Sequence, residues 1–211
     1  MLVLGDAHAD DPANREALLA AYDAADADRA LQVGDLGYYD LPVPTWFVAG
    51  NDDDVEVVEA LRAGEEPDGA RNARLLAGEA VELEGRRVAG LSGTYAPTRY
   101  EKPRSDLDPD RCRHFVREDV DRARGLEDVD VFLAHEAPHG LLEKGGSDVG
   151  CRPVDDVLAA LEPDLCLVGH HHRHARSTFG PTAVVGLAPV WEGYYTLDPQ
   201  TLALDRHPVS R

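Results

Sequence analysis

The chain has 211 residues, enough for one domain with a sizeable core, and a net charge of −19 from 40 acidic and 21 basic residues. Such a surface repels nucleic acid at ordinary ionic strength, because phosphate binding draws on lysine and arginine and only two residues are lysines. No apolar run approaches the roughly 20 residues that span a bilayer, and no leader pattern begins the chain, so we expect one cytoplasmic domain over 1–211.

Charge and cysteine content also indicate a compartment. Repulsion between carboxylates is screened over a few ångströms in concentrated salt, where an acidic surface keeps a protein soluble. We therefore interpret the charge as that of a halophilic protein from a haloarchaeal type of cytoplasm. The three cysteines, Cys112, Cys151 and Cys166, are odd in number and lack paired spacing, so we expect a reducing compartment and no disulfide.

The first 64 residues alternate apolar runs with helical patterns. Each run is apolar nearly throughout, as strands buried on both faces are. The first helical pattern has Asp11 as its N-cap and Pro12 at its first position, and the second ends at a glycine. In chain order, the sequence predicts a strand over 2–5, a helix over 11–26, strands over 30–34 and 46–50, and a helix over 54–64.

The rest of the chain adds antiparallel strands to this alternation. A hairpin that turns near Gly85 is expected over 80–93, and short strands with tight turns are expected over 176–207. Alternation of strands and helices implies an α/β sheet with much parallel pairing. Between the two antiparallel regions, the sequence predicts a helix over 108–125, a strand over 131–134, a helix over 153–163 and a strand over 165–169.

Polar residues that can bind metals follow all five apolar runs, which end in GDAH, GDLG, GND, HEAP and GHHHR. Ligands bind at this edge of an open α/β sheet, and the glycines let the backbone approach a ligand closely. In extended chain, Asp6 and His8 point to one side, as do His170 and His172. A single ending of this kind is usually only a turn. Five in series have no purely structural reason, so the sequence predicts a metal site.

The donor set indicates which ions are bound. Carboxylate, amide and imidazole suit Mn²⁺, Fe²⁺ and Zn²⁺, and the absence of cysteine argues against structural zinc or an iron–sulfur centre. Seven donors are too many for one ion and suit two divalent ions, Mn²⁺ first and Fe²⁺, Zn²⁺ or Ni²⁺ as alternatives. The predicted metal ligands are Asp6, His8, Asp35, Asn51, His135, His170 and His172.

In this order, the motifs resemble the signature of the calcineurin-like metallophosphoesterase superfamily: GD-x-H, GD-x-x-D, GN-H-D/E, H and GH-x-H. They extend from residue 6 to residue 172 and so cover most of the chain. The resemblance implies an α/β fold, a sandwich of two mixed β-sheets flanked by helices. It also implies that Asp35 bridges two ions, one held by Asp6, His8 and His172 and the other by Asn51, His135 and His170.

The resemblance implies hydrolysis of a phosphodiester, or of a phosphomonoester, by attack of a metal-bridging hydroxide. The expected partner is a small phosphoester or nucleotide; nucleic acid is disfavoured by the charge, no membrane is expected, and a homo-oligomer is left open. Residues 86–138 are similar to RNA lariat debranching enzymes, which carry cysteine where this chain has Asp6 and GN-H-E where it has GNDD. A nuclease or debranching-like phosphodiesterase is therefore one alternative, with Arg99, Arg104 and 173–177 as a basic patch.

An alternative of another class is a metal-binding scaffold of the same fold without catalysis, as in the retromer subunit. A scaffold need not keep seven ligands, so we favour the enzyme. Bound metal and turnover of bis(p-nitrophenyl) phosphate distinguish the two.

Two positions depart from the signature. Tyr38 stands where the second motif often has an aspartate, with Asp40 two residues later. Asp52 stands where most members have a histidine that contacts the phosphate and protonates the leaving group. An aspartate is a poor proton donor and a poor clamp for an anion. Either the substrate has a good leaving group, such as an aryl or nucleotide phosphate, or another group donates the proton.

Asp52 and His139 are therefore the candidate catalytic residues: Asp52 to orient a water or bind a further cation, and His139, with His174 as a further candidate, to donate the proton. Some small phosphodiesterases of the superfamily carry GN-x-D here, which gives Asp53 a supporting position. Asp54 is expected to cap the next helix.

Overall fold

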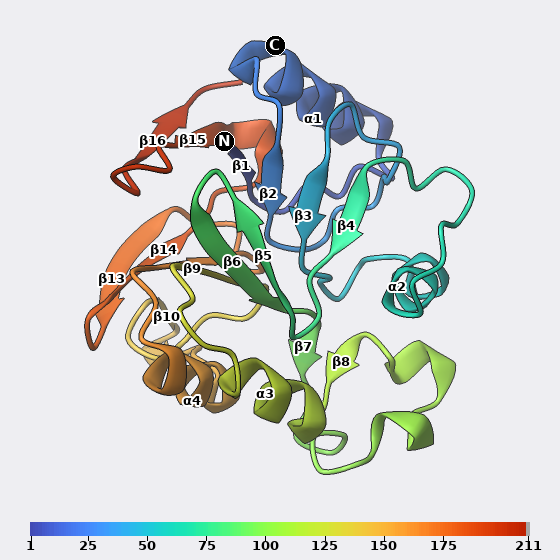
Figure 1. The fold of residues 1–211 in the computed structure, drawn as a ribbon, viewed down its shortest axis with the longest axis vertical. Coiled ribbons are helices and arrows are strands. Elements are labelled where there is room, and N and C mark those ends of the chain that lie inside the picture. Colours follow the sequence, from blue (N-terminus) through green and yellow to red (C-terminus); the bar gives the residue numbers. More distant parts are fainter. Residues whose placement is uncertain (210–211) are drawn as a thin grey trace.

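Two six-stranded sheets pack face to face in the computed structural model, which describes residues 1–209 (Figure 1). The first sheet has the order β16-β15-β1-β2-β3-β4 and the second has the order β13-β14-β12-β9-β6-β5. Both sheets are mixed, because β1 to β4 and the set β6, β9, β12 and β14 run parallel while the outer strands are antiparallel. The predicted sandwich of two mixed sheets is confirmed.

The strands are short. The first sheet consists of β1 Leu2–Leu4, β2 Ala30–Gln32, β3 Thr45–Phe47, β4 Ala73–Leu75, β15 Tyr194–Leu197 and β16 Leu204–His207. The second consists of β5 Ala80–Leu83, β6 Arg86–Leu91, β9 Val131–Ala134, β12 Leu165–Val168, β13 Ala175–Phe179 and β14 Thr182–Gly186. Two small pairs lie outside the sheets: β7 Thr94–Tyr95 with β8 His114–Phe115, and β10 Glu143–Lys144 with β11 Ser147–Asp148.

Helices cover the outer face of each sheet (Figure 1). Helices α1 Pro12–Ala25 and α2 Val55–Arg62 pack on the first sheet, and α3 Arg117–Arg124 and α4 Arg152–Leu161 pack on the second. Single 3₁₀ turns are η1 Arg104–Asp106, η2 Pro109–Arg111 and η3 Val190–Glu192. None of the helices within residues 1–209 combines the length and hydropathy of a membrane span.

Each central strand is buried on both faces. In β1, Val3 packs in the layer between the sheets while Leu2 and Leu4 pack against the α1 side. In β9, Leu133 faces the layer between the sheets and Phe132 faces the layer under α3 and α4. Alternate side chains thus enter two apolar layers, which explains why these strands read as continuous apolar runs.

Most predicted elements are confirmed within a few residues. The side chain of Asp11 accepts hydrogen bonds from the N–H groups of Ala13 and Asn14, which fixes the start of α1. Gly64, with φ of +78°, follows α2. The predicted hairpin is formed by β5 and β6, with Gly85 at φ of +79° in its turn.

Two predictions were wrong in part. The segment 108–125 is not one helix: it forms η2, then β8, then α3. The Asp-Pro start produces only the 3₁₀ turn η2, because Phe115 and Val116, which follow it, are buried. The carboxylate of Asp119 accepts a hydrogen bond from the N–H of Val116, so α3 begins after Val116. In the C-terminal region, β14 is more than an added antiparallel strand: it pairs antiparallel with β13 and parallel with β12.

Candidate metal centre

The carboxyl ends of the parallel strands meet at one edge, where the two sheets are joined by contacts between their loops. The N–H of His170, after β12, donates to Oδ1 of Asp6, after β1, at 3.0 Å. Nδ1 of His135, after β9, lies 2.8 Å from the carbonyl oxygen of Val33, after β2. Residues that follow strands of both sheets therefore line one site, as expected for parallel strand ends.

Glycine is required at two of these strand ends. A Cβ on Gly34, whose φ is +105°, would overlap Nδ1 of His135. A Cβ on Gly50 would overlap Oδ1 of Asp35. The glycines that precede the predicted ligands thus allow neighbouring loops to approach within contact distance.

The first group of donors consists of Asp6, His8 and His172. The Nε2 atoms of His8 and His172 lie 3.1 Å apart. Nε2 of His172 lies 3.7 Å from Oδ2 of Asp6. Asp6 is fully buried, while the His172 side chain is 41% exposed, so this group opens to solvent through the imidazole of His172.

The second group consists of Asn51, His135 and His170. Nε2 of His135 lies 3.3 Å from Oδ1 of Asn51 and 3.1 Å from Nδ1 of His170. His135 is fully buried, and Asn51 and His170 are partly buried. The second group therefore lies deeper than the first.

Asp35 lies between the two groups. Its Oδ2 is 3.6 Å from Nε2 of His8 and 3.3 Å from Nε2 of His135. Its Oδ1 accepts a hydrogen bond from the N–H of Asp52 at 2.7 Å. The side chain is 3% exposed, so this carboxylate is available to both groups but hardly to water.

The backbone of the site is left-handed at several donors, contrary to one expectation. The φ angles are +42° at His8, +53° at Asp35, +68° at His170 and +51° at His172. His170 and His172 are therefore not in extended chain and do not point to the same side: His170 contacts His135, whereas His172 contacts His8. Left-handed conformations of non-glycine residues cost roughly 1 kcal/mol each and cluster at functional sites.

The buried charges of the centre favour a cation. Burial raises the pKa of Asp35, but its hydrogen bond with His135 and the charge of that residue lower it below its usual value. Burial lowers the pKa of His135, but the hydrogen bond and charge of Asp35, with the charge of Asp6, raise it to about 9. Burial raises the pKa of Asp6, and its Oδ2 has no hydrogen-bond partner within residues 1–209. A carboxylate oxygen left without a partner beside imidazole nitrogens fits a divalent ion.

A buried carboxylate, Asp53, supports the loop that carries Asp35. Its two oxygens accept hydrogen bonds from the N–H groups of Asp35, Leu36, Gly37 and Gly50, and from the hydroxyl of Tyr39. The residue therefore has the supporting position that GN-x-D predicts. Tyr38 and Asp40 do not support the loop in this way: the ring of Tyr38 packs under the guanidinium of Arg15, and Asp40 forms an ion pair with Arg71.

Asp52 lies at the mouth of the centre. Its side chain is 57% exposed, and its Oδ2 is 3.8 Å from Nδ1 of His8. Donor atoms of His8, Asp35 and Asp52 all lie within 4.8 Å of one another, so Asp52 could contribute to a cation site there. The structure thus brings this predicted residue to the centre.

The candidate proton donors have other partners. Nδ1 of His139 lies 2.6 Å from Oδ2 of Asp155 on α4, and within residues 1–209 none of its hydrogen bonds or ion pairs is with a predicted ligand. Nδ1 of His174 lies 3.1 Å from the hydroxyl of Tyr195, on which its ring stacks. Arg104 is also not free to line a basic patch, because it forms an ion pair with Asp119 at 2.7 Å.

Two neighbours of the centre were not predicted. The indole of Trp191 lies against the rings of His8 and His172, with centroids 5.9 and 5.4 Å apart. Nη1 of Arg113 donates to the carbonyl oxygen of Asn51 at 2.7 Å. Neither residue follows a strand run, so the strand-end pattern does not find them. The one available signal for Trp191 is that the chain has only two tryptophans.

No family model matches the chain. Among curated proteins, it is 27% identical over 173 residues to a lariat debranching enzyme of Drosophila pseudoobscura pseudoobscura, a match that covers 67% of this chain and 32% of that protein. It is 28% identical over 156 residues to a lariat debranching enzyme of Arabidopsis thaliana, over 62% of this chain and 37% of that protein. The matched region thus spans about a third of the length of these relatives.

Solved structures have the same fold over nearly the whole chain. A protein of Thermus thermophilus aligns with a TM-score of 0.69 and 18% identity, covering 99% of this chain and 98% of that one. A protein described as a novel archaeal phosphodiesterase aligns with a TM-score of 0.50 and 12% identity, covering 98% of each chain. At these identities the likeness is one of fold.

Proposed function

We propose that the chain is a calcineurin-like metallophosphoesterase, a hydrolase that binds two divalent ions and cleaves a phosphodiester. One observation carries the proposal. Donor atoms after five strands of two sheets lie in two groups that share the buried carboxylate of Asp35. A packing role alone gives no reason for such an arrangement, because it leaves Oδ2 of Asp6 without a partner among the described residues.

Asp6, His8 and His172 would hold one ion and Asn51, His135 and His170 the other, with Asp35 between them. Two divalent ions supply Lewis acidity, which lowers the pKa of a bound water and neutralises phosphate charge. With two of the seven donor residues anionic, a pair of divalent ions would leave the site net positive by two charges. The site can therefore attract an anionic ester although the whole chain is strongly acidic.

The protein residues orient these donors. Asp53 fixes the backbone of the Asp35 loop, and Arg113 fixes the carbonyl of Asn51. Asp52 faces the solvent side of His8, where it could orient a water or accept a proton. With an aspartate here, we favour an ester whose leaving group needs little protonation. We prefer Mn²⁺ among the ions, with Fe²⁺, Zn²⁺ and Ni²⁺ as alternatives.

The test combines metal content with turnover. After loading with Mn²⁺ in molar KCl, we expect two ions per chain by elemental analysis and hydrolysis of bis(p-nitrophenyl) phosphate. Asp35→Asn should lose at least about a hundredfold in turnover and bind less metal. Asp40→Asn is the matched control, since Asp40 pairs with Arg71 and should retain both. A chain that has no turnover, with or without bound metal, would instead be a scaffold of this fold.

A second candidate is a debranching-like activity on RNA. It is favoured by the relatives named lariat debranching enzymes, and the net charge of −19 weighs against it. Branched 2′–5′ RNA, linear DNA and cyclic nucleotides should be compared in molar KCl. Cleavage of the branched RNA in preference to the other two would favour this candidate.

A further inference from the structure

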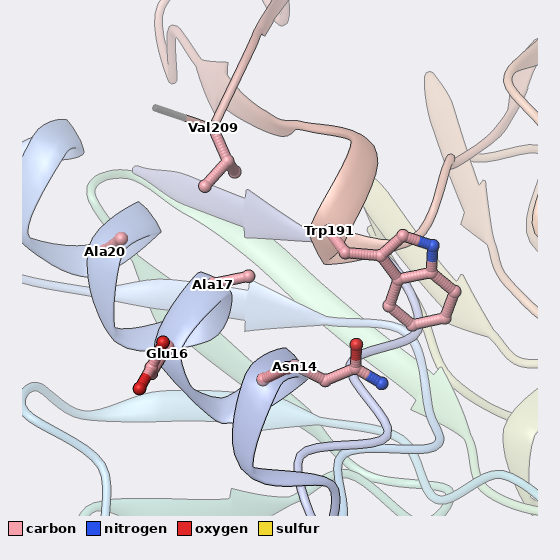
Figure 2. A pocket seen from close by; sticks show the side chains of 7 residues that line it. Asn14, Glu16, Ala17, Ala20, Trp191 and Val209 are labelled. Carbon is pink, nitrogen blue, oxygen red and sulfur yellow. The ribbon is translucent and has the colours of Figure 1, made fainter. Parts of the chain in front are cut away.

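A groove of about 620 Å³ adjoins the candidate metal centre, between helix α1 and the turn η3 (Figure 2). The α1 wall carries Ala13, Ala17 and Ala20, which are spaced i, i+4 and i+7 and therefore lie on one face of the helix. Trp191 and Val209 also line the groove. Small side chains on one side and an indole on the other leave a slot suited to a flat group.

The indole connects this groove to the centre. Trp191 lies at 5.9 Å from the His8 ring and 5.4 Å from the His172 ring, between centroids. The turn that carries it is fixed, because the N–H of Val190 donates to the carbonyl oxygen of Asp6 at 2.9 Å. On the opposite wall, the side-chain amide of Asn14 donates to the carbonyl oxygen of His8 at 3.3 Å. A phosphoester at the centre therefore has the groove directly beside it.

The charges of the residues that line the groove indicate which kind of chemical group it can bind. Among the described residues that line it there is no lysine or arginine, and the only ionised residue is Glu16. A second phosphate would be repelled here. A neutral ring would gain contact with the indole face and the alanines, while Glu16 and Asn14 offer acceptor oxygens to exocyclic amino groups.

We propose that this groove binds a nucleobase carried by the phosphoester at the centre, with Trp191 as the stacking and specificity-determining residue. The inference rests on the proposed function, since the phosphate must be held at the metal centre. It narrows the substrate from phosphoesters in general to nucleotide esters. Trp191 would then have two kinds of neighbour at once: the imidazoles of His8 and His172, and the base in the groove.

Binding of a nucleotide and of the same phosphate without its base provides the test. Trp46→Phe leaves Trp191 as the single tryptophan, so fluorescence reports on the groove. On the Mn²⁺-loaded protein, with phosphate release monitored, adenosine 5′-monophosphate should quench this emission and bind roughly ten- to a hundredfold more tightly than ribose 5-phosphate. Equal affinities, or no change in emission, would overturn the inference.

Groove variants separate stacking from packing. Ala17→Leu should fill the groove and remove the preference for the nucleotide, with ribose 5-phosphate affinity and metal content unchanged. Ala24→Leu, at an exposed position one turn beyond Ala20 on the same helix face and outside the groove lining, is the matched control and should change neither affinity. Trp191→Phe should keep part of the preference and Trp191→Leu should lose it. If Trp191 only packs on the imidazoles, Trp191→Leu would lower the metal content and reduce the affinities for the nucleotide and for ribose 5-phosphate equally. Ala17→Leu would then have no effect on either affinity.

The two proposals fail in different ways. Turnover of bis(p-nitrophenyl) phosphate without any preference for the nucleotide would overturn the groove assignment alone. Absence of metal and of turnover would overturn the proposed function, and the groove assignment with it.

Discussion

Three consecutive aspartates, Asp52 to Asp54, occupy three different environments at the end of one strand. Asp54 accepts the N–H groups of Glu56 and Val57 and caps α2. Asp53 is buried beneath the Asp35 loop, and Asp52 is exposed beside His8. The cap was predictable, because it depends on the residues that follow it. Most partners of Asp53 were not, because all of them except Gly50 lie on another loop.

Asp53→Asn tests the support of the Asp35 loop. Asparagine would turn an amino group toward backbone donors and leave buried N–H groups without acceptors, so we expect the free energy of unfolding to fall by about 2–4 kcal/mol. Mn²⁺ affinity should fall as well, since Asp35 would lose its position. Asp54→Asn is the control, as asparagine caps helices as well as aspartate does. Urea unfolding and metal titration measure both; equal effects of the two substitutions would contradict this role.

Asp52→His tests the missing proton donor. The site of Asp52 is open to solvent and 3.8 Å from His8, so an imidazole there could reach a leaving group. We expect turnover to rise roughly tenfold or more for alkyl phosphoesters, whose leaving groups need a proton, with little change for p-nitrophenyl esters. Asp52→Asn is the control without an acid. A histidine variant no better than the asparagine variant on alkyl esters would show that no acid is lacking.

At the scale of elements, strand ends were predictable and the chain between them was not. A buried run followed directly by a polar residue, with a glycine between them in four of the five runs, identifies each strand and its ligand from adjacent positions, as for β1 and Asp6. The segment 108–125 has a helical pattern, but burial of Phe115 beside β7 interrupts it. Long-range packing, which the local pattern does not contain, decided the outcome there.

Arg104 holds this interrupted segment together. Its guanidinium pairs with Asp119 at 2.7 Å and with Glu59 at 3.5 Å, and donates to the carbonyl oxygens of Cys112 and His114. Arg104→Ala would leave the buried Asp119 carboxylate with weaker partners, so we expect a loss of about 3–5 kcal/mol in unfolding free energy.

The matched control is Arg117→Ala, which breaks the exposed pair with Glu101 and should leave stability almost unchanged. Thermal unfolding of both variants, with the same buffer and protein concentration, measures the contrast. Similar losses for the two variants would contradict a structural role for the buried pair.

At the scale of the whole molecule, the centre depends on how the two sheets face each other. The first sheet supplies the loops with Asp6, Asp35 and Asn51, and the second supplies His135 and His170. The sequence predicted the donors, and the family resemblance implied their pairing into two ion sites. The structure brings these donor atoms close together, and their role as metal ligands stays a prediction. The groove beside Trp191 could not be predicted, because it forms between residues far apart in the chain.

The net charge of −19 leads to a prediction about salt. Repulsion between surface carboxylates opposes the compact state, and the screening length falls to about 3 Å at 1 M salt. We expect the urea concentration at the midpoint of unfolding to rise as KCl increases from 0.1 to about 2 M. We also expect fluorescence and circular dichroism to follow one and the same transition, as for a single domain over 1–211. A falling midpoint would contradict the halophilic interpretation, and separate transitions would contradict one domain.

The join between the sheets also determines when the centre can exist. Within the first sheet, the amino group of Met1 donates to the carbonyl oxygen of Leu197, 196 positions away, and between the sheets the N–H of His170 donates to Asp6 across 164 positions. Contacts of such separation close large loops, which slows folding and leaves them until much of the chain is available. A nascent chain that has released residues 1–64 has Asp6, Asp35 and Asn51 but none of the three donor imidazoles that follow β9 and β12, those of His135, His170 and His172. The second group is not complete before His170 is synthesised, nor the first before His172, so neither can hold an ion with all its donors until most of the chain has been made.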